Sequence, residues 1–328
     1  GYPTREWRGG PLSPHGMDLG AQNIGSPLLW GAFLVGVALV LAVDLKVSTR
    51  QQSTFREALW WSIFWIVLSV GFGFFVWFRY GGEQGLEFFA GYLLEKSLSV
   101  DNLFVFVLLF RSFAIPPQFQ HRVLFWGVLG AIVLRGTLIL AGVALVQRFH
   151  WIIAVFGAIL VYTAWKILFH KGEETEPSDN AVVRWVARKL PMTTTIEGSH
   201  FFVKHEGRRF GTPLLLALVA AETTDLVFAL DSIPAVFAVT DDPFLVFSSN
   251  ICALLGLRAL YFVVRGALAR LRYLKPGLAG ILIFVGLKML LFKWVDLPTG
   301  TSLLIITAIL VVALVFSLLR PLPPDEQG

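Results

Sequence analysis

Five carboxylates lie inside two hydrophobic segments of this chain, and each segment is long and apolar enough to cross a bilayer. The first segment, LEFFAGYLLEKSLSVDNLFVFVLLF, carries Glu95 and Asp101. The second, TPLLLALVAAETTDLVFALDSIPAVF, carries Glu222, Asp225 and Asp231. An Asp at the centre of a membrane helix costs about 2.5–3.5 kcal/mol on insertion scales. Because folding alone gives no reason to place so many acids there, the pattern predicts an ion or proton pathway.

The spacing of the acids predicts where their side chains point. Glu222 and Asp225 are three residues apart, so they share one face of a helix. Asp231 lies six residues beyond Asp225, about 240° further round the helix, and therefore points elsewhere. Pro234 has no N–H to donate to the carbonyl of Leu230. We therefore expect the helix to loosen beside Asp231 and to leave backbone carbonyls free.

The candidate ligands are all oxygen donors. Asn102 follows Asp101 and Ser232 follows Asp231, which adds an amide carbonyl and a hydroxyl to the carboxylates. Ligation by oxygen alone favours Mg²⁺, Ca²⁺ or Mn²⁺ over Zn²⁺ or copper ions. Metal binding requires ionised carboxylates and releases protons, so the expected chemistry is exchange of a divalent cation for protons.

Three basic residues in the hydrophobic segments, Lys96, Arg135 and Arg258, are candidate counter-ions or proton-coupling groups for the acids. Five acids against three cations leave a formal charge of −2, which one divalent cation or two protons would neutralise. In the alternative interpretation, the acids pair with these cations only to lock a helix bundle. We favour the ion pathway because the acids are concentrated on two segments that resemble each other.

The composition is that of a polytopic membrane protein. Hydrophobic residues make up 56% of the chain and charged residues 15%, against about 25% charged residues in soluble domains, and the mean hydropathy is +0.71. The single cysteine, Cys252, excludes an internal disulfide and a cysteine-based metal site. We find no nucleophile–base pair and no cofactor motif, so we expect neither an enzyme nor a prosthetic group. The basic residues lie mostly in loops, where they set membrane orientation and do not indicate nucleic-acid binding.

Hydrophobic runs of about 20 residues predict an all-α protein with nine transmembrane helices. Loops rich in Lys and Arg alternate with loops poor in them. This alternation places the N-terminus outside and the C-terminus inside a bacterial cytoplasmic membrane. The expected spans are 27–45, 57–78, 86–110, 122–146, 149–169, 212–238, 246–268, 276–294 and 301–319.

The predicted domain organisation is a single transmembrane domain over residues 26–320 with short polar ends. Residues 1–25 form an extracytoplasmic tail, in which we interpret 1–16 as a non-native extension ahead of a natural start at Met17. Residues 321–328 form a disordered cytoplasmic tail. The cytoplasmic loop 170–211 contains NAVVRWVARKL, an expected amphipathic helix on the inner membrane surface, and an expected hairpin that turns at Glu206 and Gly207.

Spans three to five resemble spans six to eight. GAIVLRGTLIL resembles CALLGLRALYF, which aligns Arg135 with Arg258, and FGAILVYTAWKILF resembles AGILIFVGLKMLLF. The acidic motifs also match, Glu95-x5-Asp101-Asn102 with Asp225-x5-Asp231-Ser232. Because each unit has an odd number of crossings, the two copies have opposite orientations. Such a 3+3 inverted repeat is typical of transporters whose substrate site lies near the membrane midplane.

These motifs resemble the TerC family of integral membrane proteins, and most closely its Alx-type branch. The resemblance rests on GYLLEKSLSVDNLFVF, FWGVLGAIVLR, AETTDLVFALDSIPAVFAVTDDPF, SSNICALLGLRALYF and GLKML. It implies manganese homeostasis, chiefly Mn²⁺ export, within the lysine-exporter superfamily. The family name reflects an association with tellurium resistance. The resemblance also implies that the metal ligands are Glu95, Asp101, Asn102, Glu222, Asp225, Asp231 and Ser232.

The sequence leaves two other functions open. The chain could be a membrane partner of the secretion machinery that supplies metal to exported proteins, which the family resemblance also allows. It could also be an amino-acid exporter, as the superfamily suggests. The first predicts association with a protein-conducting channel, and the second predicts amino-acid efflux that does not depend on metal.

Overall fold

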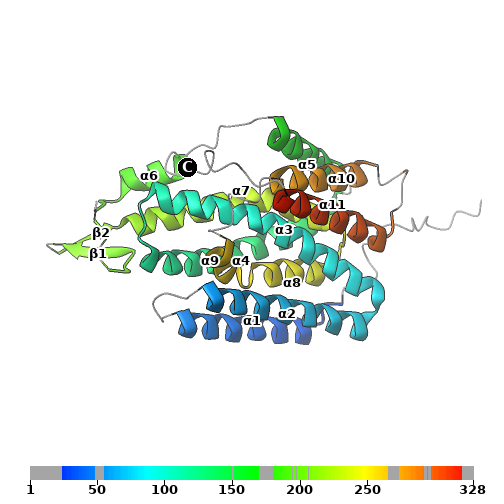
Figure 1. Ribbon diagram of the computed structural model, residues 1–328, viewed down its shortest axis with the longest axis horizontal. Coiled ribbons are helices and arrows are strands. Elements are labelled where there is room, and N and C mark those ends of the chain that lie inside the picture. The colour runs from blue at the N-terminus through cyan, green and yellow to red at the C-terminus, as the bar shows by residue number, and fades with distance from the viewer. Residues whose placement is uncertain are drawn as a thin grey trace, which may run out of the picture.

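The structure is a computed structural model that describes residues 24–48, 55–149, 151–169, 180–193, 195–196, 198–205, 207–264, 273–291, 294 and 297–319. Residues 1–23 of the predicted N-terminal tail 1–25, the predicted C-terminal tail 321–328 and residues 170–179 of the 170–211 loop lie outside these residues. The described residues form helices α1 to α11 and one two-stranded hairpin. Most of the helices lie side by side along one direction, and the hairpin and α6 lie at one end of the bundle (Figure 1).

The helices occupy all the positions where the sequence predicts spans. The first five are α1 (Pro27–Ser48), α2 (Phe55–Tyr80), α3 (Gly82–Ser112), α4 (Pro117–Arg148) and α5 (Ile152–Phe169). The short helix α6 (Ala181–Lys189) and strands β1 (Phe202–His205) and β2 (Arg208–Gly211) follow. The remaining helices are α7 (Pro213–Phe237), α8 (Pro243–Leu254), α9 (Leu257–Val264), α10 (Leu274–Leu290) and α11 (Thr299–Leu319).

Six segments of the described chain are long and apolar enough to cross a membrane, judged by length and composition. They are α2, α4, α5, α7, α11 and the stretch Pro243–Val263, which covers α8 and α9. Large apolar side chains are exposed on the outer helices, among them Val67 on α2, Trp165 on α5 and Leu304 on α11. An apolar outer surface of this kind suits contact with lipid, so the chain is an all-α, multi-pass membrane protein.

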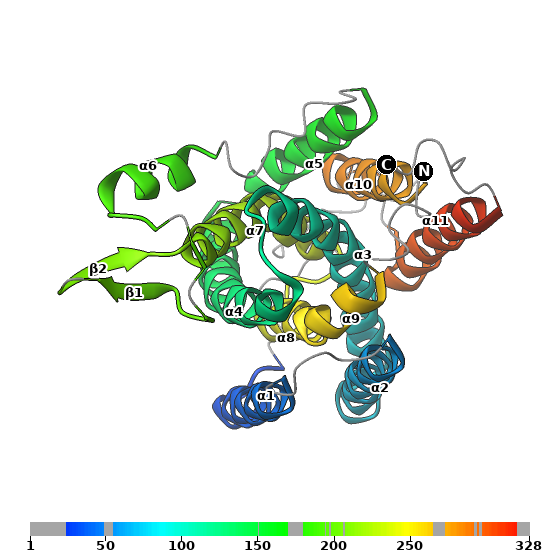
Figure 2. The same ribbon diagram turned by 60° about the vertical axis from the view of Figure 1, so that its left-hand side comes forward.

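The centre of the bundle is formed by α3, α4, α7 and α8, with α1 and α2 on one side and α5, α10 and α11 on the other (Figure 2). Helix α3 packs against α7 and α8, and α4 packs against α7. Buried alanines on α7, including Ala217, Ala220 and Ala229, let neighbouring helices approach closely. The helices that carry the predicted acids, α3 and α7, therefore both lie in the centre of the bundle.

Helices α5 and α10 make the most extensive contact between two helices in the described chain. A Cβ added at Gly157 would lie 2.9 Å from the carbonyl oxygen of Gly286, and one added at Gly286 would lie 2.9 Å from that of Gly157. Gly157 also faces Leu290, and Gly286 faces Val161, so the two helices run antiparallel. The absence of side chains at the crossing allows the two backbones to touch.

The structure corrects the expected position of the helix break. Helix α7 continues through Pro234 and ends at Phe237. The turn after the proline is closed by bonds such as Ala238 N–H to Pro234 O, 3.2 Å. The break occurs in the predicted span 246–268, between α8 and α9. There Gly256 has φ +79°, a left-handed conformation that favours glycine.

The soluble elements of the 170–211 loop are confirmed where the structure describes them. Asn180 caps α6 by accepting a hydrogen bond from Val182 N–H at 2.9 Å. Strands β1 and β2 pair antiparallel, and Gly207 at their turn has φ +82°. The expected hairpin, predicted from the turn at Glu206 and Gly207, is therefore confirmed.

Helix α8 begins at a capped turn. The Asp242 carboxylate accepts hydrogen bonds from Phe244 N–H at 2.7 Å and Leu245 N–H at 3.0 Å. It also accepts one from Ile24 N–H at 2.7 Å, which ties the residues before α1 to this turn. Burial raises the pKa of Asp242 above its ordinary value, although these hydrogen bonds act in the opposite direction.

Candidate ion site at the centre of the bundle

Arg135 of α4 joins two of the predicted acids. Its Nε and Nη2 atoms donate to the two oxygens of Asp225 on α7, at 3.0 and 2.7 Å, in a bidentate pair. Its Nη1 atom forms a short ion pair with Glu95 of α3. Arg135 and Glu95 are fully buried, and Asp225 is 9% exposed. The acids that the sequence aligned between the two motifs therefore meet at one guanidinium.

Neutral donors and acceptors complete this cluster. Asn250 of α8 donates to Glu95 Oε2 at 3.0 Å, and the Ser99 hydroxyl lies 3.4 Å from Glu95 Oε1. The Ser232 hydroxyl accepts from Arg135 Nη1 at 3.4 Å. Four helices, α3, α4, α7 and α8, thus supply one connected polar network inside an apolar core. These hydrogen bonds tie the four helices to one another.

In this arrangement the Arg135 guanidinium occupies the place that a bound cation would take between the two carboxylates. Two carboxylates from different helices and a hydroxyl surround one positive charge. The described residues contain no group of three or more His, Cys, Asp or Glu side chains arranged to hold a metal ion. Among the described side chains, the predicted acidic ligands therefore do not form a group of three around a common point.

The other acids of the second motif lie apart from the Arg135 cluster. The Glu222 carboxylate packs against Gly130 of α4, so Glu222 and Asp225 both face α4, as their spacing predicted. Asp231 faces α5, where it accepts a hydrogen bond from the Thr163 hydroxyl at 2.8 Å and interacts electrostatically with Lys166. The acids of α7 therefore separate into one group toward α4 and one toward α5.

The ligands predicted on α3 are placed in part. Asp101 lies within α3, and its side chain is outside the described part of the chain. Asn102 is buried and faces α7, where it lines a small pocket beside Asp225 and Thr224. The other lining residues are apolar: Val105, Phe106, Leu109, Ala221 and Phe228. Asn102 is thus close to Asp225 of the cluster, as predicted.

Comparison with known proteins decides the family. The family described as "Integral membrane protein TerC family" matches residues 80–322, which is most of the chain. This protein belongs to the TerC family. It is similar to "Uncharacterized membrane protein STKORF319" of Myxococcus xanthus, with 48% identity over 91% of this chain and 94% of that protein.

The TerC-family chain is also similar to proteins named "Putative membrane-bound redox modulator Alx". The identity is 46% for the Salmonella typhi protein, over 90% of this chain and 95% of that protein. It is 44% for the protein of Escherichia coli (strain K12), over 90% of this chain and 96% of that protein. No solved structure matches the chain.

Lys96 of this TerC-family chain has a different partner from the one the sequence predicted. Its Nζ atom donates to the carbonyl oxygens of Ala253 at 3.0 Å and Leu255 at 3.4 Å. These carbonyls lie at the break between α8 and α9, where the end of a helix leaves acceptors without intrahelical partners. Within the described residues Lys96 therefore caps α8 and does not pair with an acid.

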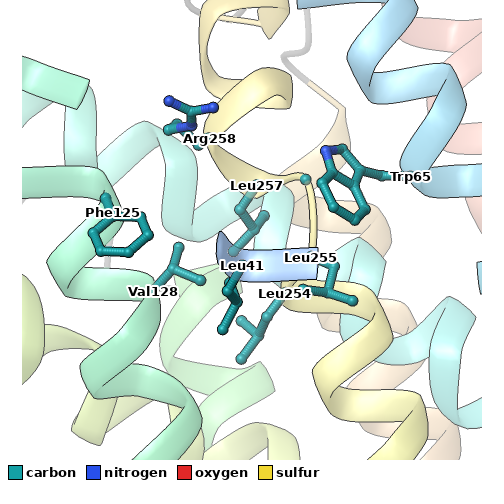
Figure 3. A pocket seen from close by; sticks show the side chains of 9 residues that line it. Leu41, Trp65, Phe125, Val128, Leu254, Leu255, Leu257 and Arg258 are labelled. Carbon is teal, nitrogen blue, oxygen red and sulfur yellow. The ribbon is translucent and has the colours of Figure 1, made fainter. Parts of the chain in front are cut away.

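Arg258 also lies at this break, away from the Arg135 cluster. It lines a pocket formed by α1, α2, α4 and the α8–α9 junction (Figure 3). The other lining residues are apolar or aromatic side chains and one glycine: Leu41, Trp65, Phe125, Val128, Leu254, Leu255, Gly256 and Leu257. The two arginines that the sequence aligned therefore have different surroundings in this TerC-family chain.

Sequence reasoning missed the roles of Asn250 and Thr163. Asn250 holds Glu95 from α8, and Thr163 holds Asp231 from α5. Asn250 is fully buried in the apolar stretch SSNICALLGLR. A polar side chain inside such a stretch must find a partner, and this signal was present in the sequence. The identity of the partner was not, because it comes from a distant helix.

Proposed function

We propose that this TerC-family protein exports divalent cations, chiefly Mn²⁺, across the cytoplasmic membrane in exchange for protons. The observation that carries the proposal is the meeting of Glu95 and Asp225, from different helices, at a fully buried cation. Membrane helices rarely hold buried acids unless an ion or a proton uses them. A role in manganese homeostasis agrees with the family resemblance in the motifs.

In this proposal, the conformation described here is the empty carrier. The Arg135 guanidinium neutralises Glu95 and Asp225 when substrate is absent, as the predicted counter-ion role requires. A metal ion would displace Arg135 and draw its oxygen ligands from the predicted set. The site geometry in the loaded carrier would then differ from the present one. The predicted ligands are Glu95, Asp101, Asn102, Glu222, Asp225, Asp231 and Ser232.

The ligand chemistry supports a hard divalent cation, and the family resemblance implies that this cation is Mn²⁺. The polar groups around Arg135 and in the adjacent pocket are carboxylates, hydroxyls and amides. Such groups suit hard divalent cations and give no thiolate or imidazole to favour zinc or copper. No prosthetic group and no enzymatic reaction are part of the proposal.

The proposal includes nine spans and an inverted repeat of α3–α5 with α7–α10. Helices at all nine predicted positions support the span number. The antiparallel contact of α5 with α10, which are corresponding helices of the two copies, supports the repeat. Substrate would then be carried by movement of one copy against the other. The N-terminus would lie outside and the C-terminus in the cytoplasm.

A redox function, which the name of the Alx relatives describes, has less support in this chain. The single cysteine, Cys252, is buried in α8, so the chain cannot form an internal dithiol. A change in manganese handling could alter cellular redox balance indirectly. The experiment below tests the transport step itself.

The test is Mn²⁺ flux into proteoliposomes that contain a pH-sensitive dye. Purified wild type is compared with Glu95→Gln, Asp101→Asn and Asp231→Asn. The matched control is Glu83→Gln, an exposed acid at the start of the same helix α3. We expect Mn²⁺ movement with opposite proton movement in wild type and the control, and strong loss of both in the three site variants.

The other outcomes separate the alternatives. Flux that is unchanged in the site variants would assign the acids a structural role. Amino-acid efflux without metal dependence would favour the amino-acid exporter. If folded, reconstituted wild type moves no metal, the role as a metal-supplying partner of the secretion machinery becomes the better hypothesis.

A further inference from the structure

The face formed by α6 and the β1–β2 hairpin carries both exposed cations and exposed apolar side chains. These elements lie together at one end of the bundle, where the membrane helices end (Figures 1 and 2). Residues 180–212 contain six Lys or Arg residues and two acidic residues. None of the acids or cations of the proposed transport site lies in this segment.

Helix α6 has a wider apolar face than its contact with the bundle requires. Val183 is buried where α6 packs against α7. Val182 and Trp185, three residues apart, are 43% and 61% exposed. At 100° per residue these two side chains lie 100° and 160° away from Val183, so α7 cannot cover them. An exposed tryptophan on an amphipathic helix suits the boundary between headgroups and acyl chains.

Exposed cations surround this apolar face. On α6 they are Arg184, Arg188 and Lys189, and on the hairpin they are Lys204, Arg208 and Arg209. No acidic side chain pairs with them among the described residues, in which the ion pairs are those of Arg135. With six cations against two acidic residues, the segment has a net positive charge that favours an anionic partner.

The face is fixed to the membrane-spanning part of the protein. Thr193 N–H donates to the carbonyl of Gly211 at 2.9 Å, which ties the segment after α6 to β2. Arg122 of α4 donates to the Ser199 hydroxyl at 2.8 Å and lies 5.3 Å from the Phe201 ring centre. These contacts hold α6 and the hairpin against the end of the helix bundle, while the basic side chains stay exposed.

We propose that α6 and the hairpin bind anionic phospholipid headgroups of the adjacent leaflet, with Trp185 and Val182 in the interface. Charge complementarity selects anionic lipid, and the exposed apolar side chains select a membrane over a soluble acidic partner. This inference does not depend on the transported substrate. It predicts that the binding of α6 and the hairpin to the membrane depends on the lipid composition.

The test is hydrogen–deuterium exchange of α6 in the full protein, reconstituted in nanodiscs. The lipids are phosphatidylcholine alone or phosphatidylcholine mixed with phosphatidylglycerol. We expect slower exchange over residues 181–190 with the anionic lipid and a smaller effect at high salt. Each of the substitutions Arg184→Gln, Arg188→Gln and Lys189→Gln removes one cation. Each should reduce, by about fivefold, the factor by which the anionic lipid slows exchange of α6.

Two variants provide controls. Arg148→Gln removes an exposed cation at the opposite end of α4 and should leave the exchange of α6 unchanged. Arg184→Lys with Arg188→Lys keeps the charge and should keep the lipid effect.

Trp185→Ser tests the apolar part of the contact. It should speed exchange of α6 in both lipids, since the apolar anchor is lost.

Equal exchange of α6 in the two lipids would overturn the proposal. The acidic stretch before α6 offers another partner for the same cations. If Glu173→Gln with Glu174→Gln and Glu176→Gln speeds exchange of α6 in phosphatidylcholine alone, the basic face belongs to that stretch and the proposal also fails.

Discussion

Arg135 and Arg258 occupy aligned positions in the two similar halves of the chain, yet the structure gives them different surroundings. Arg135 sits within the continuous helix α4 and bridges Glu95 and Asp225. Arg258 follows the break between α8 and α9 and borders a largely apolar pocket. The comparison teaches that sequence repetition can place equivalent charges without giving them equivalent roles.

The residue two positions before each arginine accounts for much of the difference. Gly256 stands two residues before Arg258 and has φ +79°. Val133 stands two residues before Arg135, and a β-branched residue strongly disfavours that backbone conformation. The helix therefore breaks in one half only. Lys96, from α3 of the first half, caps the carbonyls at that break in the second half, whereas Arg135 is used on carboxylates.

The largest expected effect distinguishes the two arginines. Arg135→Met should lower the free energy of unfolding by about 3–5 kcal/mol, because it leaves two buried acids without their cation. Arg258→Met should cost clearly less, because Arg258 is only partly buried. Thermal unfolding in detergent measures both. Adding Glu95→Gln and Asp225→Asn to Arg135→Met should recover part of the loss, and equal losses for the two arginines would contradict the comparison.

The helix break gives the next largest effect. Gly256→Ala should cost about 2–4 kcal/mol, because it combines backbone strain with a collision, the new Cβ lying 2.6 Å from Trp65 Cβ. Gly207→Ala is matched in φ, at +82°, but has open space around it. It should cost only about 1–2 kcal/mol. Similar thermal shifts for the two variants would show that Trp65 does not fix the break.

Lys96 should contribute less than either. Lys96→Met leaves the carbonyls of Ala253 and Leu255 without their donor, and we expect a loss of about 1–3 kcal/mol in the free energy of unfolding. Lys189→Met, on the exposed end of α6, is the matched control, with an expected change within about 0.5 kcal/mol. A Lys96 variant as stable as this control would exclude the capping role.

The smallest expected effect comes from making the first half resemble the second. Val133→Gly should cost about 0.5–1 kcal/mol, the usual effect of glycine in a helix interior. It should not break α4, because the three bonds from Arg135 to Asp225 and Glu95 hold the following turn. Hydrogen exchange across residues 129–137 measures this. Rapid exchange there would mean that glycine alone determines where a helix breaks.

The sequence by itself determined the class of the protein, the positions of its helices, the hairpin and the shared face of Glu222 and Asp225. These follow from local chemistry: apolar runs suit lipid, the Glu-Gly turn suits a hairpin, and helical periodicity fixes side-chain direction. The sequence also identified Arg135 as a partner for acids inside the membrane, since an unpaired buried charge is too costly to keep.

Only the tertiary structure decided which partner each charged group takes. Arg135 meets Glu95, 40 residues away, and Asp225, 90 residues away. Lys96 could equally have paired with an acid, and the break was expected at Pro234 and not at Gly256. These choices depend on how distant helices pack, because several partners satisfy the same buried charge and only the packed bundle brings one of them within hydrogen-bonding distance.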